Sequence, residues 1–276
     1  MLDGLCKHWG FYFTCGDRTL GSADFQDALR RIGDDSKFKS NISSLTEDHS
    51  NRSIVQHYIC AALLARAILF GHFRTYAKSK SISEIDQKRI WVLLQAWPRP
   101  PLLSSDMFHE LTNIILRAPS MFIFEELRKV WGRWDLGNVA PFLVLDEAQD
   151  AARMYTQAFL AKTGNIHRSA LSALITTLDS ALEALLPHKI ITGTGLNLDQ
   201  VRGEVRLGSG KIGEIEVVHD TGSFLTKEDQ SAYIMQYLWP GTKEGELADD
   251  AKRLLRRAWR WLRGRCVRFV ISLITC

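Results

Sequence analysis

Short apolar runs alternate with longer amphipathic stretches along this chain. Three runs have the length of β-strands: residues 9–15, which are rich in aromatic side chains, residues 142–145 and residues 189–192. A fourth strand is expected at residues 215–218. Because helical stretches separate these runs, the pattern predicts an α/β fold with a parallel sheet, in which 142–145 and 189–192 are neighbouring strands.

Apolar residues recur at helical spacing through most of the remaining chain. Helices are expected to begin near Ser22 and then to cover residues 53–78, 90–97, 106–116, 125–134, 151–161, 168–185, 226–237 and 244–263. Residues 34–52 are polar and are predicted to form a loop. The pattern therefore indicates two domains: an α/β domain over residues 1–222 with a helical insertion at about 16–135, and a helical domain over 223–276.

The apolar run at 142–145 ends in two adjacent carboxylates, Asp146 and Glu147. In open α/β sheets, ligands bind at the carboxyl ends of the strands. An acid there can hold Mg²⁺ on the phosphates of ATP or GTP, and the next acid can polarise a water. This pattern is typical of the Walker B strand of P-loop NTPases. The alternative is that these acids cap the helix expected from Ala151.

Other residues fit further roles in such a site. Thr192 or Thr194, at the tip of the neighbouring strand, can sense the γ-phosphate, and Gly193 between them can bring a backbone N–H near an anion. Gln149 either contacts the γ-phosphate or is simply polar at the strand exit. Arg265 or Arg263 can reach the γ-phosphate from the C-terminal helical domain, which would then act as a lid.

The phosphate-binding motif of such a site, G-x-x-x-x-G-K-[ST], is not found in the sequence. The most similar stretch, residues 208–212, has Val205 at the first glycine position and Ile212 in place of the hydroxyl residue. It also follows the acidic strand, whereas the motif precedes it. We interpret this stretch as a surface turn.

Composition places the chain among ordinary folded proteins, with 46% hydrophobic and 24% charged residues. The sequence shows no run of 18 apolar residues and no signal peptide, so no membrane partner is expected and an intracellular location, cytoplasmic or nuclear, is predicted. The five cysteines are scattered and form no CxxC pair. Their pattern favours a reducing compartment and argues against a zinc site.

The net charge of +4 is unevenly distributed. Eight of the 35 basic residues lie between Lys252 and Arg268, and no acid follows Asp250. Five of these arginines share one helical face, at positions 253, 256, 257, 260 and 263. Two interpretations stay open: this face binds the phosphates of a nucleic acid, or the helix packs its apolar side and the arginines are solvated.

Taken in order, several segments resemble the P-loop NTPase region of fungal Crinkler-type proteins. The matching segments are residues 4–13, 21–27, 142–149, 192–196 and 259–269. The resemblance implies a P-loop NTPase-like sheet with a C-terminal helical lid, and Mg²⁺-dependent hydrolysis of ATP or GTP in a full-length relative. In that family, the segment resembling residues 1–8 ends the helix that follows the phosphate loop. The resemblance therefore implies a truncated protein, with an incomplete lid and an incomplete or inactive site.

Two other functions remain open, so the sequence does not decide whether this chain is an enzyme. The first is a degenerate interaction module without catalysis, which the missing phosphate-binding motif favours. The second is a fragment of a nucleic-acid-dependent ATPase, because residues 146–150 also resemble motif II of UvrD-type helicases. The arginine and aromatic motifs expected after the next strand in those helicases are not evident.

Overall fold

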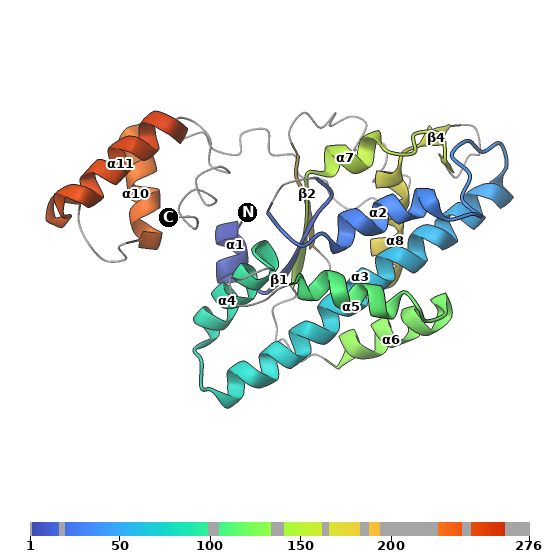
Figure 1. Cartoon of the computed structure of the whole chain (residues 1–276), viewed down its shortest axis with the longest axis horizontal. Coiled ribbons are helices and arrows are strands. Elements are labelled where there is room, and N and C mark those ends of the chain that lie inside the picture. The colour runs from blue at the N-terminus through green and yellow to red at the C-terminus, as the bar shows by residue number, and fades with distance from the viewer. Residues whose placement is uncertain are drawn as a thin grey trace. The chain divides into compact units, whose positions relative to one another are not determined.

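The computed structural model describes residues 2–16, 20–98, 105–133, 141–161, 166–182, 188–193, 226–238 and 244–262. Its internal contacts divide the chain into two compact units, residues 1–215 and residues 216–276. The chain is mixed α/β and mostly helical, as Figure 1 shows.

A three-stranded parallel sheet lies at the centre of the first unit. Its strands are β1 (Gly10–Thr14), β2 (Phe142–Asp146) and β5 (His188–Ile191), in the order β1-β2-β5. In this register, Thr14 lies opposite Asp146 and Leu145 lies opposite Ile191. The predicted parallel sheet, with 142–145 beside 189–192, is thereby confirmed, whereas the strand expected at 215–218 lies outside the described residues.

Strand β1 forms because both of its faces are covered. Phe11 and Phe13 belong to the main core, while Tyr12 packs with Leu5 and Val144 in a second cluster. All five residues of the strand are buried. A strand buried on both faces needs a nearly continuous apolar run, which explains the aromatic-rich sequence at this position.

Helices surround the sheet in the first unit. Their bounds are α1 (Leu2–Lys7), α2 (Asp24–Asp34), α3 (Leu45–Ser79), α4 (Glu84–Ala96), α5 (Met107–Ile115), α6 (Ser120–Gly132), α7 (Ala148–Arg153) and α8 (Ala170–Leu182). Helix α3 contacts α2, α5, α6 and α8, so it organises the helical layer. Two short antiparallel strands, β3 (Phe159–Leu160) and β4 (His167–Arg168), complete the described part of this unit.

Two element predictions were wrong. The loop expected at 34–52 contains the first turns of α3, because the Ser44 hydroxyl accepts a hydrogen bond from the Glu47 amide and caps the helix. The helix expected at 151–161 ends at Arg153. There the chain turns through Tyr155, whose φ of 53° is incompatible with a right-handed helix, and continues into β3.

Within the described residues, α3 is the one helix long and apolar enough to cross a membrane. However, 67% of its most apolar window is buried inside the protein. That degree of burial is typical of the core helix of a folded domain.

The second unit contains α10 (Lys227–Leu238), a 3₁₀ turn (Glu244–Glu246) and α11 (Asp249–Leu262). It has its own apolar core. Residues Ile234, Met235, Leu247, Leu255 and Ala258 form this core. Helices α10 and α11 are in contact with each other, so α11 buries one apolar face against its neighbour.

Candidate functional site

The carboxyl ends of the three strands bring together two residues predicted to form a site. Asp146 ends β2, and Thr192 directly follows β5. The Thr192 amide donates to the Leu145 carbonyl at 2.9 Å, which extends the strand pairing to this point. The Thr192 hydroxyl then donates to Asp146 Oδ1 at 2.5 Å. The predicted sensor position and the predicted Mg²⁺-binding acid are therefore in direct contact.

The Asp146 carboxylate accepts two further hydrogen bonds. The Glu147 amide donates to Oδ1 at 3.0 Å, and the Tyr12 hydroxyl donates to Oδ2 at 2.7 Å. Burial of the phenol, as the main cause, and the negative charge of Asp146, as the second, raise the pKa of Tyr12 far above its usual range. The phenol therefore remains a hydrogen-bond donor. Tyr12 was not predicted as part of the site, because a tyrosine in an aromatic strand is typical of a core residue.

Glu147 has an unusual backbone conformation. Its φ of 52° and ψ of 36° place it in the left-handed region, although it is not a glycine. Such a conformation costs about 1–2 kcal/mol in an L-residue and is concentrated at functional sites. Glu147 is also the N-cap of α7, but its side chain makes no capping hydrogen bond. The alternative that Glu147 serves as a helix cap is thus not supported by its geometry.

Gln149 is turned toward Glu147. Its side-chain amide donates to the Glu147 carboxylate. Its other polar atom, Oε1, is buried and has no hydrogen-bond partner among the described residues. A buried acceptor without a donor is costly, so this oxygen is suited to receive a donor from water or from a ligand.

Gly16 permits the segment after β1 to approach this acidic turn. A Cβ atom at Gly16 would lie 2.8 Å from the Cβ of Glu147 and 3.2 Å from Oδ2 of Asp150. A side chain at position 16 would therefore displace the turn that carries Glu147. The sequence around Gly16 contains no recognisable motif, so only the fold reveals this contact.

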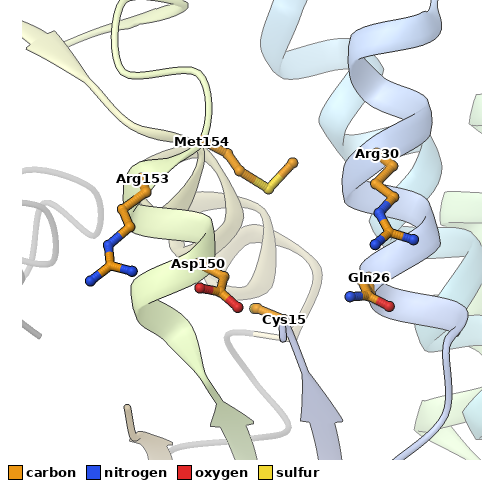
Figure 2. Close-up of a pocket in the computed structure, with 6 residues that line it drawn as sticks. All are labelled: Cys15, Gln26, Arg30, Asp150, Arg153 and Met154. Atoms are coloured by element: carbon orange, nitrogen blue, oxygen red, sulfur yellow. The ribbon is translucent and has the colours of Figure 1, made fainter. Parts of the chain in front are cut away.

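A cavity of about 350 Å³ lies beside the acidic turn, on the side of β1. Figure 2 shows Gln26 and Arg30 on α2 across the cavity from Asp150 and Met154, with Cys15 at its base. Burial, together with the nearby negative charges of Asp150, Asp146 and Glu147, raises the pKa of the Cys15 thiol above its usual range. The thiol is therefore protonated at neutral pH and is a poor nucleophile.

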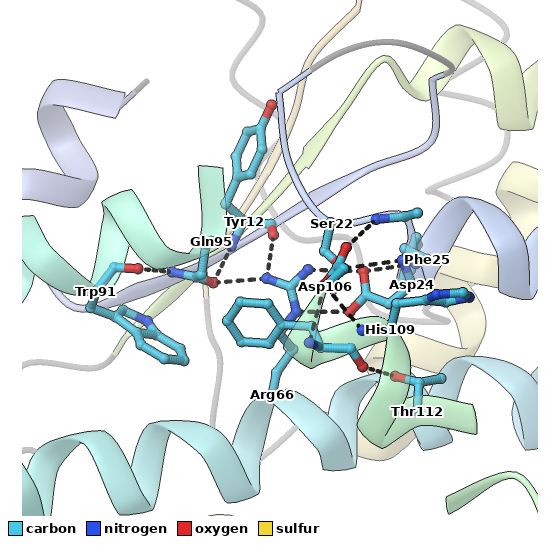
Figure 3. A network of polar contacts seen from close by, with 12 residues as sticks. Tyr12, Ser22, Asp24, Phe25, Arg66, Trp91, Gln95, Asp106, His109 and Thr112 are labelled. Carbon is cyan, nitrogen blue, oxygen red and sulfur yellow. Dashed lines mark hydrogen bonds and ion pairs between the residues drawn. The ribbon is translucent and has the colours of Figure 1, made fainter. Parts of the chain in front are cut away.

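A buried polar network fixes the strand that carries Tyr12, as Figure 3 shows. Arg66 is fully buried and binds the Asp24 carboxylate through two nitrogens, at 2.8 and 2.9 Å. It also donates to the Tyr12 carbonyl at 3.0 Å, and the Tyr12 amide donates to Gln95 Oε1 at 2.9 Å. The backbone at Tyr12 is thus held from both sides, which orients its hydroxyl toward Asp146.

The side chains at the strand tips suit a hard cation. Asp146 and Glu147 supply carboxylate oxygens, and Thr14 and Thr192 supply hydroxyl oxygens, which are the donors that Mg²⁺ prefers. The described residues contain no group of three or more His, Cys, Asp or Glu side chains placed to hold a metal ion. Mg²⁺ usually takes one or two carboxylates and completes its shell with water and phosphate oxygens, so a Mg²⁺ ion at Asp146 stays a prediction.

The remaining predicted site residues have different outcomes. Gly193 follows Thr192 in the described chain and is half-buried. Thr194, Arg263 and Arg265 lie outside the described residues. Their predicted roles therefore stay predictions.

Comparison with known proteins does not identify the chain. No protein-family model, no curated protein and no solved structure matches it.

Proposed function

We propose that residues 1–215 form a P-loop NTPase-like domain that binds ATP or GTP with Mg²⁺, similar to the NTPase region of fungal Crinkler-type proteins. One observation carries the proposal: the Asp146 carboxylate at the tip of the central described strand is hydrogen-bonded to the Thr192 hydroxyl at the tip of the next. An acid and a polar sensor on adjacent parallel strands are two of the parts that NTP hydrolysis requires.

In this proposal, each residue of the site has one role. Asp146 holds Mg²⁺, Thr192 or Thr194 contacts the γ-phosphate, and Glu147 accepts a proton from the attacking water. The metal ion neutralises charge on the phosphate oxygens when it is bound. Gln149 and Gly193 would complete the contacts to the nucleotide from the first unit.

The strain at Glu147 supports the assignment of the base. Its left-handed backbone and the close approach of Gly16 hold the carboxylate in a turn at the carboxyl end of the sheet. A strained residue persists only where the surrounding structure fixes it. A helix cap would not require this conformation, whereas a positioned base benefits from it.

A second candidate function is a non-hydrolysing interaction module. Two features favour it: both Asp146 oxygens already accept hydrogen bonds from protein groups, and the Glu147 carboxylate accepts one from Gln149. The sequence also lacks the G-x-x-x-x-G-K-[ST] motif. In such a module, the hydrogen bonds of Asp146 and Glu147 would serve only to hold the strand ends in place.

Phosphate release from Mg²⁺-ATP and Mg²⁺-GTP tests the first candidate. We expect the wild-type chain to release phosphate, and Glu147→Gln to lower the rate by about 10²-fold or more, as is usual for loss of a general base. Glu125→Gln, at an exposed position of α6, is the matched control and should leave the rate unchanged. A wild-type rate equal to that of buffer would exclude hydrolysis by this chain, as expected both for the interaction module and for an incomplete NTPase site.

We also propose an intracellular location, cytoplasmic or nuclear. Cys15 and Cys60 are buried free thiols in the described chain. Free and buried thiols are typical of a reducing compartment.

A further inference from the structure

The outer face of α11 carries a row of arginines. Arg253, Arg256 and Arg257 are exposed, whereas Leu255 and Ala258 are buried against the core of the second unit. These arginines follow one another at i, i+3 and i+4 spacing, so they lie on one face of the helix. In the sequence, Arg260 continues this spacing.

The row has the length of a few nucleotide steps. At 1.5 Å per residue, positions 253 to 257 extend over about 6 Å, which corresponds to roughly two steps of a nucleic-acid strand. Arginine presents a planar fork of donors that binds phosphate oxygens in pairs. The spacing and the side-chain type therefore both match a phosphate backbone.

The ion pair of Arg253 with Asp250 does not prevent Arg253 from binding a phosphate. Arg253 contacts Asp250 at 2.5 Å, but the two side chains are 63% and 89% exposed. Exposed pairs of this kind contribute little stability and exchange readily. Arg253 can therefore turn to a phosphate at little cost.

The burial of the apolar face of α11 distinguishes between two polyanions that it could bind, a membrane surface and a nucleic acid. A helix that lies in a membrane surface inserts its apolar face among the lipids. In α11 that face packs on α10, with Leu255 at 2% exposure and Ala258 at 6%. The exposed side chains of this face are charged, while its neighbours Leu254 and Trp259 are half-buried, so the surface suits nucleic acid better than a bilayer.

We propose that the arginine face of α11, formed by Arg253, Arg256 and Arg257, binds the phosphate backbone of a nucleic acid. The binding is driven by charge and by paired hydrogen bonds to phosphates, so it has little sequence preference. It does not depend on nucleotide binding by the first unit.

Fluorescence anisotropy with the full chain tests this proposal, using labelled duplex DNA and single-stranded RNA of mixed sequence and about 20 nucleotides. The triple variant Arg253→Gln/Arg256→Gln/Arg257→Gln should weaken binding by about 10-fold or more and reduce the salt slope by about 2–3. The corresponding Arg→Lys variant should keep most of the salt slope, because it keeps the charge. Comparison of the two probes shows whether DNA or RNA is the preferred source of the phosphates.

The matched control lowers the net charge equally at another place. Lys37→Gln/Lys78→Gln/Lys80→Gln changes three exposed lysines of the first unit and should change binding by less than about 2-fold. Equal losses in the two triple variants would overturn the proposal, because total charge would then explain the binding. No binding by the wild-type chain, or binding to phosphatidylserine vesicles without binding to either nucleic acid, would also overturn it. Circular dichroism confirms that each variant is folded.

Discussion

Glu147 combines an unfavourable backbone conformation with a position at the tip of the sheet. Its φ of 52° is one that glycine adopts without strain. Ser81, just after the end of α3, also has a positive φ, of 53°, and lies far from the strand tips in sequence. Substitutions at these two residues therefore separate the effect of a positive φ on the free energy of unfolding from its effect on phosphate release.

We expect Glu147→Gly to raise the free energy of unfolding by about 0.5–1 kcal/mol, because the left-handed strain is relieved while one partly exposed hydrogen bond to Gln149 is lost. The same substitution should abolish phosphate release. Urea denaturation and the phosphate assay measure the two effects on one preparation.

Ser81→Gly provides the comparison. It should stabilise the chain by a similar amount and leave phosphate release unchanged, because Ser81 lies outside the site. If Glu147→Gly instead destabilised the protein, its conformation would be supported by favourable contacts and would not be a strain kept for function.

The contacts of single residues were predictable only in part. The pairing of Asp146 with Thr192 could be predicted, because carboxyl ends of neighbouring parallel strands meet at one edge of the sheet. Tyr12 and Gly16 could not be predicted as members of the site. Tyr12 reaches Asp146 from a strand 134 positions away in sequence, and the role of Gly16 depends on how closely two loops approach.

At the scale of elements, the Arg66 network joins β1 to α2, α3 and α4. Arg66 and Asp24 are both fully buried, and Arg66 also lies over the rings of Phe13 and Phe108 at 4.8 and 4.1 Å. Removing one charge of a buried pair leaves the other without compensation. Substitutions of residues in this network should therefore have non-additive effects on the free energy of unfolding.

Arg66→Met should lower the free energy of unfolding by about 3–5 kcal/mol. Adding Asp24→Asn removes the uncompensated charge, so the double variant should lose at least about 1 kcal/mol less than the two single changes added together. Arg89→Met, whose 62% exposed side chain lies 3.7 Å from Asp86, is the control and should leave stability unchanged. Strict additivity in urea denaturation would contradict the proposed coupling.

Gly10 allows β1 to pair closely with β2. A Cβ atom there would lie 2.7 Å from the Phe142 carbonyl oxygen and 2.4 Å from a methyl group of Leu5. Gly10→Ala should therefore destabilise the protein by about 1–3 kcal/mol, because backbone atoms must move. In a thermal melt, Gly132→Ala at the end of α6 should be neutral or stabilising, since no atom lies within 4 Å of its added methyl. Equal effects of the two substitutions would refute the packing argument.

The elements that could be predicted were those with a strong local pattern. The strand at 142–146 and the helix capped by Asp106 followed from an apolar run and a capping residue. The start of α3 did not, because its first turns are polar and their identity depends on contacts with β3. Asp48 accepts from the Leu160 amide, and Asn51 donates to the Ala158 carbonyl, so these polar residues serve a tertiary role.

At the scale of the whole molecule, the chain separates its charges between its parts. The first 250 residues contain 27 basic and 31 acidic residues, and the last 26 contain eight basic residues and no acid. The acidic strand tips belong to one compact unit and the arginine face to the other. The proposed nucleotide site and the proposed nucleic-acid surface can therefore be tested by variants that do not affect each other.

The central claim is that Asp146 organises a site for a nucleoside triphosphate and Mg²⁺. Titration calorimetry of the 276-residue chain with Mg²⁺-ATP and Mg²⁺-GTP tests it most directly, with Asp146→Asn as the variant and Asp34→Asn, at an exposed position, as the control. We predict saturable, Mg²⁺-dependent binding that Asp146→Asn weakens by about 10-fold or more, equivalent to roughly 1.4 kcal/mol, and that Asp34→Asn leaves unchanged. No binding by the wild-type chain, or equal binding by Asp146→Asn, would contradict the claim.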